Sequence, residues 1–139
     1  MKLSKNFTYE EMIASATAKR LGINNTPSAK EVGYLRRLCQ EVLQPIRDKY
    51  GKCITVTSGY RCPKLNKAVG GSSTSQHTQG QAVDITLGTP ALNKMLFNMI
   101  LEMIKKKEIK VGQLIDEYGY RWIHISLPYK KVNNILHIR

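Results

Sequence analysis

The chain has 139 residues, of which 42% are hydrophobic, and carries a formal net charge of +12. This length favours one domain over residues 1–139, and no apolar run of about 18 residues is present that would cross a membrane. The polar segment Met1–Asn6 lacks the continuous apolar stretch of a signal peptide. The large positive charge favours a polyanionic environment, such as nucleic acid, a membrane surface or an anionic cell-wall polymer.

The first predicted element is a helix near the N-terminus. Thr8 and Glu11 have the spacing of a capping box, in which each side chain bonds the other's backbone N–H group. The helix is expected to run to about Arg20 and to stop near Gly22, because glycine readily adopts the left-handed backbone that ends helices.

A second and longer helix is predicted to begin at Ser28, which forms another capping box with Glu31. Gly51 is expected to end it, and Pro45 is expected to bend or interrupt its last turn because proline lacks the N–H group. Apolar residues recur at helical spacing along it and predict a stripe that faces the core. This stripe comprises Val32, Leu35, Leu38, Cys39, Val42, Leu43 and Ile46.

The middle of the chain is predicted to hold two strands with a long connection between them. The β-branched run 54–58 favours a strand. Residues 59–75 contain glycine, proline and several serines, and they predict a long loop or an excursion with short helices. Long ordered loops in compact domains are often functional. Residues 81–85 then predict the second strand.

A third helix is predicted after this strand. Thr89 precedes Pro90, and proline is favoured at the first position of a helix. The lysines at 105–107 suit the negative end of the helix dipole. The apolar stripe expected to face the core comprises Leu92, Met95, Leu96, Met99, Ile100 and Met103.

The last part of the chain is predicted to be β-structure. Residues 113–118 and 121–127 predict two strands joined by a two-residue turn, Gly119-Tyr120. A turn over 128–133 and an edge strand over 135–138 follow. Helices that precede hairpin-forming strands predict an α+β fold.

The three cysteines, Cys39, Cys53 and Cys62, form neither a Cys-x-x-Cys pair nor an even-numbered disulfide framework. Cys39 lies on the apolar face of the second helix and is expected in the core. Cys53 and Cys62 either form a disulfide or stay free, and free thiols agree better with the missing signal peptide.

Residues 77–84 read His-x-x-Gly-x-Ala-x-Asp and contain two common metal ligands. If the end of this segment is a strand, Gly80, Ala82 and Asp84 share one face, where the small residues leave room for an ion and a substrate. His77 would reach in from the loop before the strand. The alternative is a turn with a surface histidine and a capping aspartate.

The predicted hairpin adds a histidine and an acid to one face. With a two-residue turn, Glu117 pairs with Trp122 and lies diagonally from His124, about 7–8 Å away. The same register sends Asp116 to the opposite face. On its own, His124 is more simply a packed strand histidine; together with His77 it suggests a metal ligand with an acid/base beside it.

Several motifs occur together along the chain. They are Ser58-Gly59-Tyr60-Arg61-Cys62-Pro63, Asn66, Val69-Gly70-Gly71, Ser75-Gln76-His77, Gly80-x-Ala82-x-Asp84, Leu114-Ile115-x-Glu117 and Trp122-x-His124-x-Ser126. This set resembles the zinc D-Ala-D-Ala carboxypeptidase and dipeptidase family, above all its small single-domain members from phages and bacteria. The likeness covers nearly the whole chain, because residues 6–47 also resemble the N-terminal part of the family.

The resemblance implies a zinc-binding α+β fold shared with the hedgehog signalling domain, with an antiparallel sheet packed against N-terminal and central helices. By position, His77, Asp84 and His124 match the zinc ligands, and Glu117 matches the acid expected to act as general base. Many members place that acid in a Glu-x-x-His pattern. Here Arg121 occupies its position, so the acid must come from the preceding strand.

Further roles follow from the same likeness. Arg61 lies in a loop near the metal in the family pattern, where it would bind the C-terminal carboxylate of a D-Ala-D-Ala-like peptide or anchor the loop. Ser75 would orient substrate or donate a hydrogen bond to a partner near the metal, or serve as a plain loop residue. Gln76 and Trp122 are expected as pocket wall at most, and His137 as a plain edge-strand residue.

We therefore expect a monomeric Zn²⁺ peptidase that hydrolyses peptidoglycan stem peptides, as a carboxypeptidase or an endopeptidase. It would be made in the cytoplasm and act at the bacterial cell wall by a route that the sequence does not give. One alternative is a non-catalytic zinc-containing cell-wall-binding module, which would need a missing acid. Another is a nucleic-acid-binding protein, but no aromatic residues are interleaved with the basic ones. The three predicted ligands also accept other divalent ions.

Overall fold

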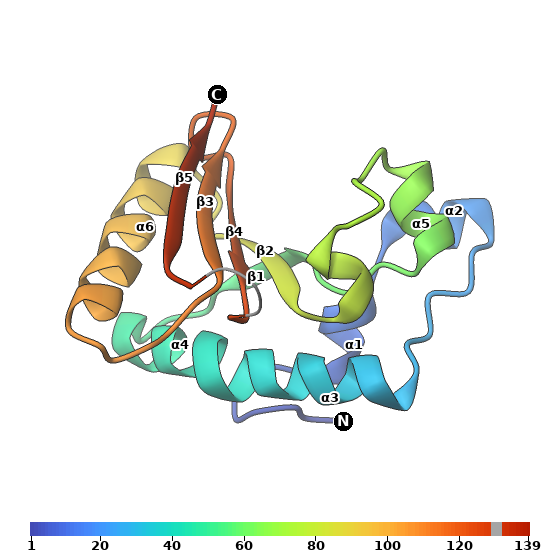
Figure 1. Cartoon of the computed structure of the whole chain (residues 1–139), viewed down its shortest axis with the longest axis horizontal. Helices are drawn as coiled ribbons and strands as arrows, with labels where there is room; N and C mark the ends of the chain where they lie inside the picture. The colour runs from blue at the N-terminus through green and yellow to red at the C-terminus, as the bar shows by residue number, and fades with distance from the viewer. Residues whose placement is uncertain (129–131) are drawn as a thin grey trace.

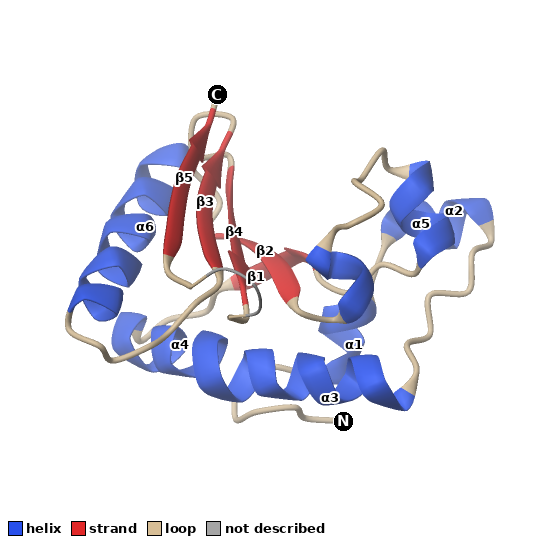
Figure 2. Cartoon of the chain, viewed as in Figure 1, coloured by secondary structure: helices blue, strands red, loops and turns tan. Residues whose placement is uncertain are grey.

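The structure is a computed structural model that describes residues 1–128 and 132–139. A five-stranded sheet, in the order β1-β2-β4-β3-β5, forms its centre (Figure 2). Together with the helices around it, this sheet confirms the α+β class. The strands are β1 (Thr55–Ser58), β2 (Ala82–Thr86), β3 (Gln113–Glu117), β4 (Trp122–Ser126) and β5 (Asn134–Ile138).

The sheet is antiparallel except at one edge. The pairs β1–β2, β2–β4 and β3–β4 are antiparallel, whereas β5 runs parallel to β3. Both edges of β4 are already occupied by β2 and β3, so the chain that turns back after β4 passes to the outer edge of β3. A strand there that runs opposite to β4 is necessarily parallel to β3. The predicted turn over 128–133 lies partly outside the described residues.

Helices surround this sheet on several sides. In Figure 1, α6 covers one face, α3 and α4 run along the lower end, and α5 and α2 lie in a lobe on the far side of β1 and β2. A short 3₁₀ turn, η2, leads into β2. The helical elements are α1 (Tyr9–Ile13), α2 (Ala16–Leu21), α3 (Ala29–Leu38), η1 (Cys39–Leu43), α4 (Gln44–Tyr50), α5 (Pro63–Ala68), η2 (Gln76–Gln79) and α6 (Pro90–Lys105). Among the described residues, none of the helices combines the length and apolar character needed to span a membrane.

The prediction of a single helix that runs to about Arg20 is wrong: two short helices, α1 and α2, take its place. The carbonyl of Met12, at the end of α1, accepts a hydrogen bond from the N–H of Tyr60 at 2.7 Å, beyond the end of β1. Ser15 then caps α2 with its hydroxyl. The break therefore comes from a long-range contact, and the predicted stop at Gly22 is present as a left-handed cap.

The second predicted helix is interrupted near Pro45, as expected. A π-turn, η1, separates α3 from α4, and the N–H of Gln44 bonds the carbonyl of Cys39 instead of the usual one. This widened turn relieves the clash that the proline ring would make with the carbonyl four residues earlier. Except for half-buried Val32, the predicted stripe of this helix is fully buried in the core.

The buried face of α6 differs from the predicted one. Leu92 and Met95 are 40% and 48% exposed, whereas Asn93 and Phe97 are buried together with Leu96, Ile100 and Met103. Met99, also predicted in the stripe, is half-buried. The helix is rotated because the Asn93 amide has backbone groups to bind. Its oxygen accepts the N–H of Leu87 at 2.7 Å, and its nitrogen donates to the carbonyl of Tyr120 at 2.9 Å.

The β3–β4 hairpin has the predicted register but not the predicted turn. Glu117 pairs with Trp122 and Ile115 with His124, as expected. The turn, however, has four residues, 118–121, and both tyrosines in it adopt positive φ angles, 52° and 65°. Four residues preserve the parity that two would give, so the faces of the strands are unchanged.

Replacing Asn93 tests how strongly α6 holds this turn. Asn93→Ala is expected to lower the free energy of unfolding by about 2 kcal/mol, because it leaves partly buried backbone groups of Leu87, Tyr120 and Arg121 without the partner that Asn93 supplies. Urea denaturation measures the change. Asn98→Ala, at an exposed position of the same helix, is the matched control and is expected to change it by less than about 0.5 kcal/mol. Equal effects of the two variants would contradict the assignment.

All three cysteines are free thiols. The alternative of a disulfide between Cys53 and Cys62 is therefore not realised. Cys62 instead caps α5, where its sulfur accepts the N–H of Leu65 at 3.4 Å. Cys39 is buried in the core as predicted, and burial raises the pKa of its thiol to about 12.

Candidate metal centre

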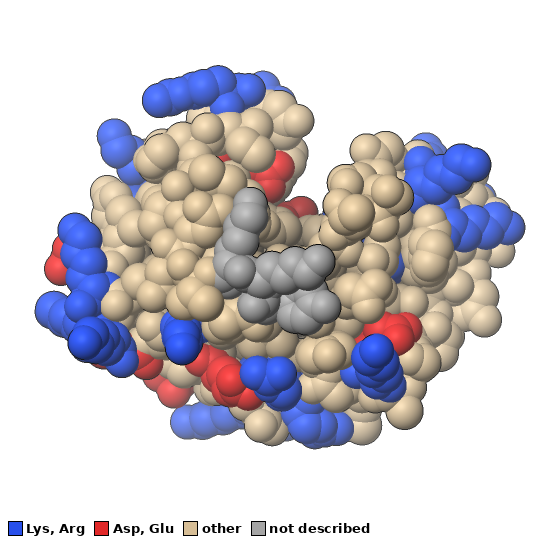
Figure 3. Space-filling view, in the orientation of Figure 1, with Lys and Arg blue, Asp and Glu red and all other residues tan. Residues whose placement is uncertain are grey.

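A cavity of about 780 Å³ opens on the face of the sheet turned away from α6. Its walls come from β2, β3 and β4 and from the long connection between β1 and β2. Figure 3 shows a hollow between the sheet and the lobe that carries α5, with acidic side chains in its walls. The surface next to the hollow in Figure 3 is mostly uncharged, and the lysine and arginine side chains lie towards the outline of the molecule.

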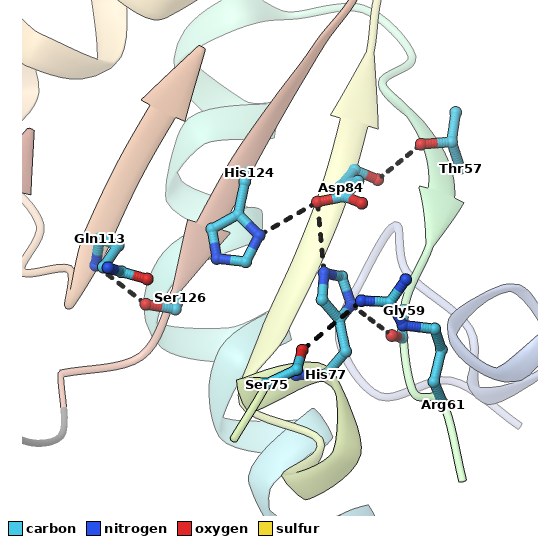
Figure 4. Close-up of polar contacts among 9 residues, drawn as sticks. All are labelled: Thr57, Gly59, Arg61, Ser75, His77, Asp84, Gln113, His124 and Ser126. Atoms are coloured by element: carbon cyan, nitrogen blue, oxygen red, sulfur yellow. Dashed lines mark hydrogen bonds and ion pairs between the residues drawn. The ribbon is translucent and has the colours of Figure 1, made fainter. Parts of the chain in front are cut away.

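His77, Asp84 and His124 converge in this cavity (Figure 4). They come from η2, β2 and β4, and Asp84 and His124 are direct neighbours in the sheet. The two imidazole rings lie 5.2 Å apart, edge to face. One ligand atom from each of the three residues lies within 4.8 Å of the other two. The sequence-predicted ligands are thus brought together by three separate elements.

The hydrogen bonds of His77 leave one of its nitrogens facing the carboxylate as an acceptor. Nδ1 lies 2.8 Å from the carbonyl oxygen of Gly59, which can only accept, so Nδ1 carries the proton. In the neutral ring Nε2 then has a lone pair, and it lies 3.3 Å from Oδ1 of Asp84. Two acceptors at this separation need a cation between them, either a second proton on the ring or a metal ion.

The geometry and chemistry of the three side chains fit a metal ion. Oδ1 of Asp84 lies 3.2 Å from Nδ1 of His124 and 3.3 Å from Nε2 of His77. In a tetrahedral site with bonds of about 2.1 Å, neighbouring ligand atoms are about 3.4 Å apart. Burial alone would raise the pKa of Asp84, but the imidazoles of His124 and His77 beside its carboxylate outweigh burial and hold the pKa well below its usual range. The carboxylate is therefore charged.

Gly59 is required where it stands because its backbone approaches α1 closely. A Cβ atom built on Gly59 would lie 2.2 Å from the carbonyl oxygen of Met12. Any side chain would push the strand end away and shift the carbonyl that orients His77. Metal sites commonly use such a partner to fix the ring of a ligating histidine.

We expect Gly59→Ala to lower the free energy of unfolding by at least about 2 kcal/mol, because a backbone clash of this kind cannot be relieved by a rotamer change. Gly33→Ala is the matched control. Gly33 is exposed within α3 and has open space around it, so alanine should stabilise the protein by about 0.5–1 kcal/mol. Thermal unfolding of both variants checks the opposite signs, and a neutral Gly59→Ala would show that the contact with Met12 is not tight.

Glu117 lines the same cavity from β3 and is half-buried. Burial, together with the negative charge of Asp84, raises the pKa of its carboxyl above the ordinary value. Arg121, at the position where other members are expected to carry the acid, is exposed in the turn. Of these two residues, only Glu117 contributes to the wall of the cavity.

Arg61 and Ser75 lie next to His77. The N–H of Arg61 donates to the carbonyl of His77 at 3.0 Å, and Nη2 lies 3.5 Å from the hydroxyl of Ser75. That hydroxyl also accepts the N–H of His77 at 3.2 Å. In the part of the chain that the structure describes, the Arg61 guanidinium forms no ion pair, and its Nε has no hydrogen-bond partner.

Sequence reasoning missed the residue that holds the Arg61 loop. The side chain of Asn25 accepts the N–H of Cys62 at 2.8 Å and donates to the carbonyl of Tyr60 at 3.0 Å. It thereby fixes the backbone on both sides of Arg61. An asparagine in a loop gives no local sign of this role. Gly59 was visible as part of a motif, but its contact with His77 spans 18 positions.

Three other expectations can be compared with the structure. Gln76 and Trp122 line the cavity, as predicted. Gly80 does not keep the metal face open: it lies before β2, and a Cβ there would be 2.5 Å from the carbonyl of Glu31 in α3. His137 is more than a plain edge residue, because its Nδ1 contacts the buried carboxylate of Asp116.

Comparison with known proteins identifies the family of the chain. No curated protein sequence matches the chain. The profile of the family described as Peptidase M15 matches residues 5–126, a range that contains every cavity residue named above. The match covers most of the chain and confirms the likeness read from the motifs. The chain belongs to the Peptidase M15 family.

Proposed function

We propose that the protein is a zinc-dependent peptidase that hydrolyses peptidoglycan stem peptides. The observation that carries the proposal is the pair of facing acceptors, Nε2 of His77 and Oδ1 of Asp84, which calls for a cation inside a cavity that Glu117 also lines. Membership of a peptidase family supports the reaction class. The three ligands leave further positions free for water and substrate, as in catalytic rather than structural zinc sites.

The ligand types favour zinc. Two imidazole nitrogens and one carboxylate, contributed by His77, His124 and Asp84, are a common donor set for this ion. Calcium and magnesium prefer sites built mainly from oxygen atoms, which the two histidines disfavour. A zinc ion held here would polarise the scissile carbonyl and lower the pKa of a bound water towards about 7.

In the proposed mechanism Glu117 transfers the proton. Its carboxylate accepts a proton from the attacking water as the carbon–oxygen bond forms, and then delivers it to the nitrogen of the leaving amine as the peptide bond breaks. The position of Glu117 in the cavity wall, half-buried beside the candidate ligands, suits both steps. His77, Asp84 and His124 would hold the zinc ion beside the reacting carbonyl.

Arg61 is proposed to bind the terminal carboxylate of the substrate. Arg61 lines the cavity close to His77, and its Nε has no hydrogen-bond partner among the residues that the structure describes. A planar guanidinium binds a carboxylate with two parallel hydrogen bonds. Ser75 would hold the guanidinium and the backbone of His77 in register. A site with a carboxylate anchor beside the metal favours removal of a C-terminal residue, that is, a carboxypeptidase.

The net charge of +12 supports the cell wall as the place of action. Lysine and arginine side chains form groups around the outline of the molecule in Figure 3, outside the hollow that holds the acidic site. Bacterial walls carry anionic polymers, and long-range attraction would speed the encounter with such a target.

Digestion of purified peptidoglycan, followed by mass spectrometry of the products with and without a chelator, tests the proposal. The expected result is loss of a C-terminal D-Ala from stem peptides, which the chelator abolishes and zinc restores. Products cut at an internal bond would keep the peptidase but reject the carboxypeptidase. Stoichiometric zinc with no cleavage of peptidoglycan or of stem peptides would instead favour a non-catalytic binding module.

A further inference from the structure

The strand β5 extends the metal-site face of the sheet with two apolar side chains. Leu136 is the partner of Ile115 and Ile138 the partner of Glu117 in the parallel pairing, and partners in adjacent strands point to the same face. Both Ile115 and Glu117 line the cavity. The alternate residue His137 points the other way, towards α6, where its ring lies 5.5 Å from that of Phe97.

These two side chains are exposed although they adjoin the site. Leu136 and Ile138 are 38% and 39% exposed, and Tyr118 beside them is 52% exposed. The Tyr118 ring lies 5.2 Å from that of Trp122, which is part of the cavity wall. We call Leu136, Ile138 and Tyr118 the apolar platform. The match to the Peptidase M15 profile ends at residue 126, so β5 lies outside the matched range.

The order of the strands fixes which end of a substrate would reach the platform. Figure 4 shows Arg61 on one side of the His77–Asp84–His124 cluster and β3, with Gln113, on the other. In the sheet, β5 lies beyond β3 on that second side. If the terminal carboxylate is bound at Arg61 and the scissile carbonyl lies at the cluster, the acyl part of the peptide runs across β3 towards β5.

The distance suits a residue close to the scissile bond. From His124 on β4 to β5 there are two strand spacings, or about 10 Å. An extended peptide advances about 3.3–3.6 Å per residue. The second residue on the acyl side therefore lies about halfway across, and a long aliphatic side chain on it covers the remaining distance to Leu136 and Ile138.

We infer that the apolar platform binds the long aliphatic side chain of the substrate residue that is second from the scissile bond on the acyl side. This inference rests on the proposed function and deepens it by naming a determinant of specificity. When one substrate side chain packs on the platform, apolar surface of both the side chain and the platform is removed from water, which favours binding by about tenfold or more. Short side chains at this position, such as that of glycine, would not reach the platform.

Two peptides that differ only at this residue test the inference: acetyl-Lys-D-Ala-D-Ala and acetyl-Gly-D-Ala-D-Ala. The wild-type protein should show a kcat/KM ratio that favours the lysine peptide by about tenfold or more. The double variant Leu136→Ser/Ile138→Ser should lose that preference, mainly through a higher KM for the lysine peptide. Leu136→Met/Ile138→Val, which keeps apolar side chains, should retain most of it.

Leu92→Ser is the matched control, because Leu92 is 40% exposed on α6 and far from the site face. It should leave the preference unchanged. If the double variant Leu136→Ser/Ile138→Ser keeps the wild-type preference, the inference about the platform is wrong while the proposed function stands. If the wild type cleaves neither peptide, the carboxypeptidase activity on which the platform rests is rejected and the platform with it, whereas the peptidoglycan digestion described above decides whether the protein is a peptidase. Sedimentation covers one further outcome. If the wild type is a dimer, and the double variant Leu136→Ser/Ile138→Ser is a monomer with the wild-type preference, the apolar platform binds a second copy of the chain and the inference is wrong.

Discussion

Glu117→Gln is expected to lower kcat for peptide hydrolysis by about 10²–10⁴-fold while the bound metal stays at the wild-type level. Glutamine has the same shape as glutamate but cannot take a proton from the attacking water or return one to the leaving amine. Glu117 lines the cavity, yet it is not one of the three side chains whose ligand atoms cluster within 4.8 Å. Proton transfer and metal binding should therefore separate in this variant.

Rate assays on a D-Ala-D-Ala peptide, together with elemental analysis of the purified variant, measure both effects. Glu102→Gln is the matched control, because Glu102 is exposed on α6 and forms an ion pair with Lys105 at 3.5 Å. It should behave like the wild type. A Glu117→Gln protein with wild-type kcat would remove Glu117 from the mechanism, and one that has lost its metal would make Glu117 a ligand instead of a base.

The face of the sheet on which each strand residue lies could be predicted, because it depends only on the alternation of side chains and on whether the turn has an even number of residues. Side chains alternate along a strand, and any turn with an even number of residues keeps the alternation in register. Glu117, Trp122 and His124 therefore lie on one face, although the turn has four residues instead of the predicted two. Asp116 lies on the other face for the same reason.

The buried face of α6 could not be predicted from hydrophobic spacing. A pattern that ranks side chains by apolar character places Leu92 and Met95 inside and Asn93 outside. The real helix buries Asn93, since its amide satisfies backbone groups of the β2–α6 connection and of the β3–β4 turn. Nothing near Asn93 in the sequence indicates that such groups lie next to it in the fold.

The orientation of His77 was also beyond local reasoning. The histidine itself stands out in the sequence because a glycine, an alanine and an aspartate follow it at suggestive spacing. Its tautomer, however, depends on a carbonyl at Gly59, and Gly59 is held by contact with Met12 in α1. The segments that carry His77, Gly59 and Met12 meet only in the folded chain. The candidate ligands were therefore predictable, whereas the contacts that aim them were not.

Removal of the Asp84 charge is expected to have the largest effect on metal binding. Asp84 supplies the only negative charge among the three clustered side chains, and despite its burial the imidazoles of His124 and His77 beside it hold its pKa well below the usual range. The carboxylate is therefore ionised at neutral pH. Asp84→Asn keeps the shape of the side chain but leaves two neutral imidazoles and an amide, which bind a divalent cation weakly.

We expect Asp84→Asn to be purified without stoichiometric metal and to lose activity by about 10³-fold or more, because the ion contributes several kcal/mol of transition-state stabilisation. Zinc at about 1,000 times its Kd should stabilise the wild type by about 4 kcal/mol and should not shift the melting temperature of the variant. Asp48→Asn, at an exposed position of α4, is the matched control and should respond to zinc like the wild type. A variant at Asp84 that keeps both its metal and its thermal response to zinc would show that the ion, if bound, lies elsewhere. Because the melting experiment needs no substrate, it tests the metal centre independently of the peptide that the protein cleaves.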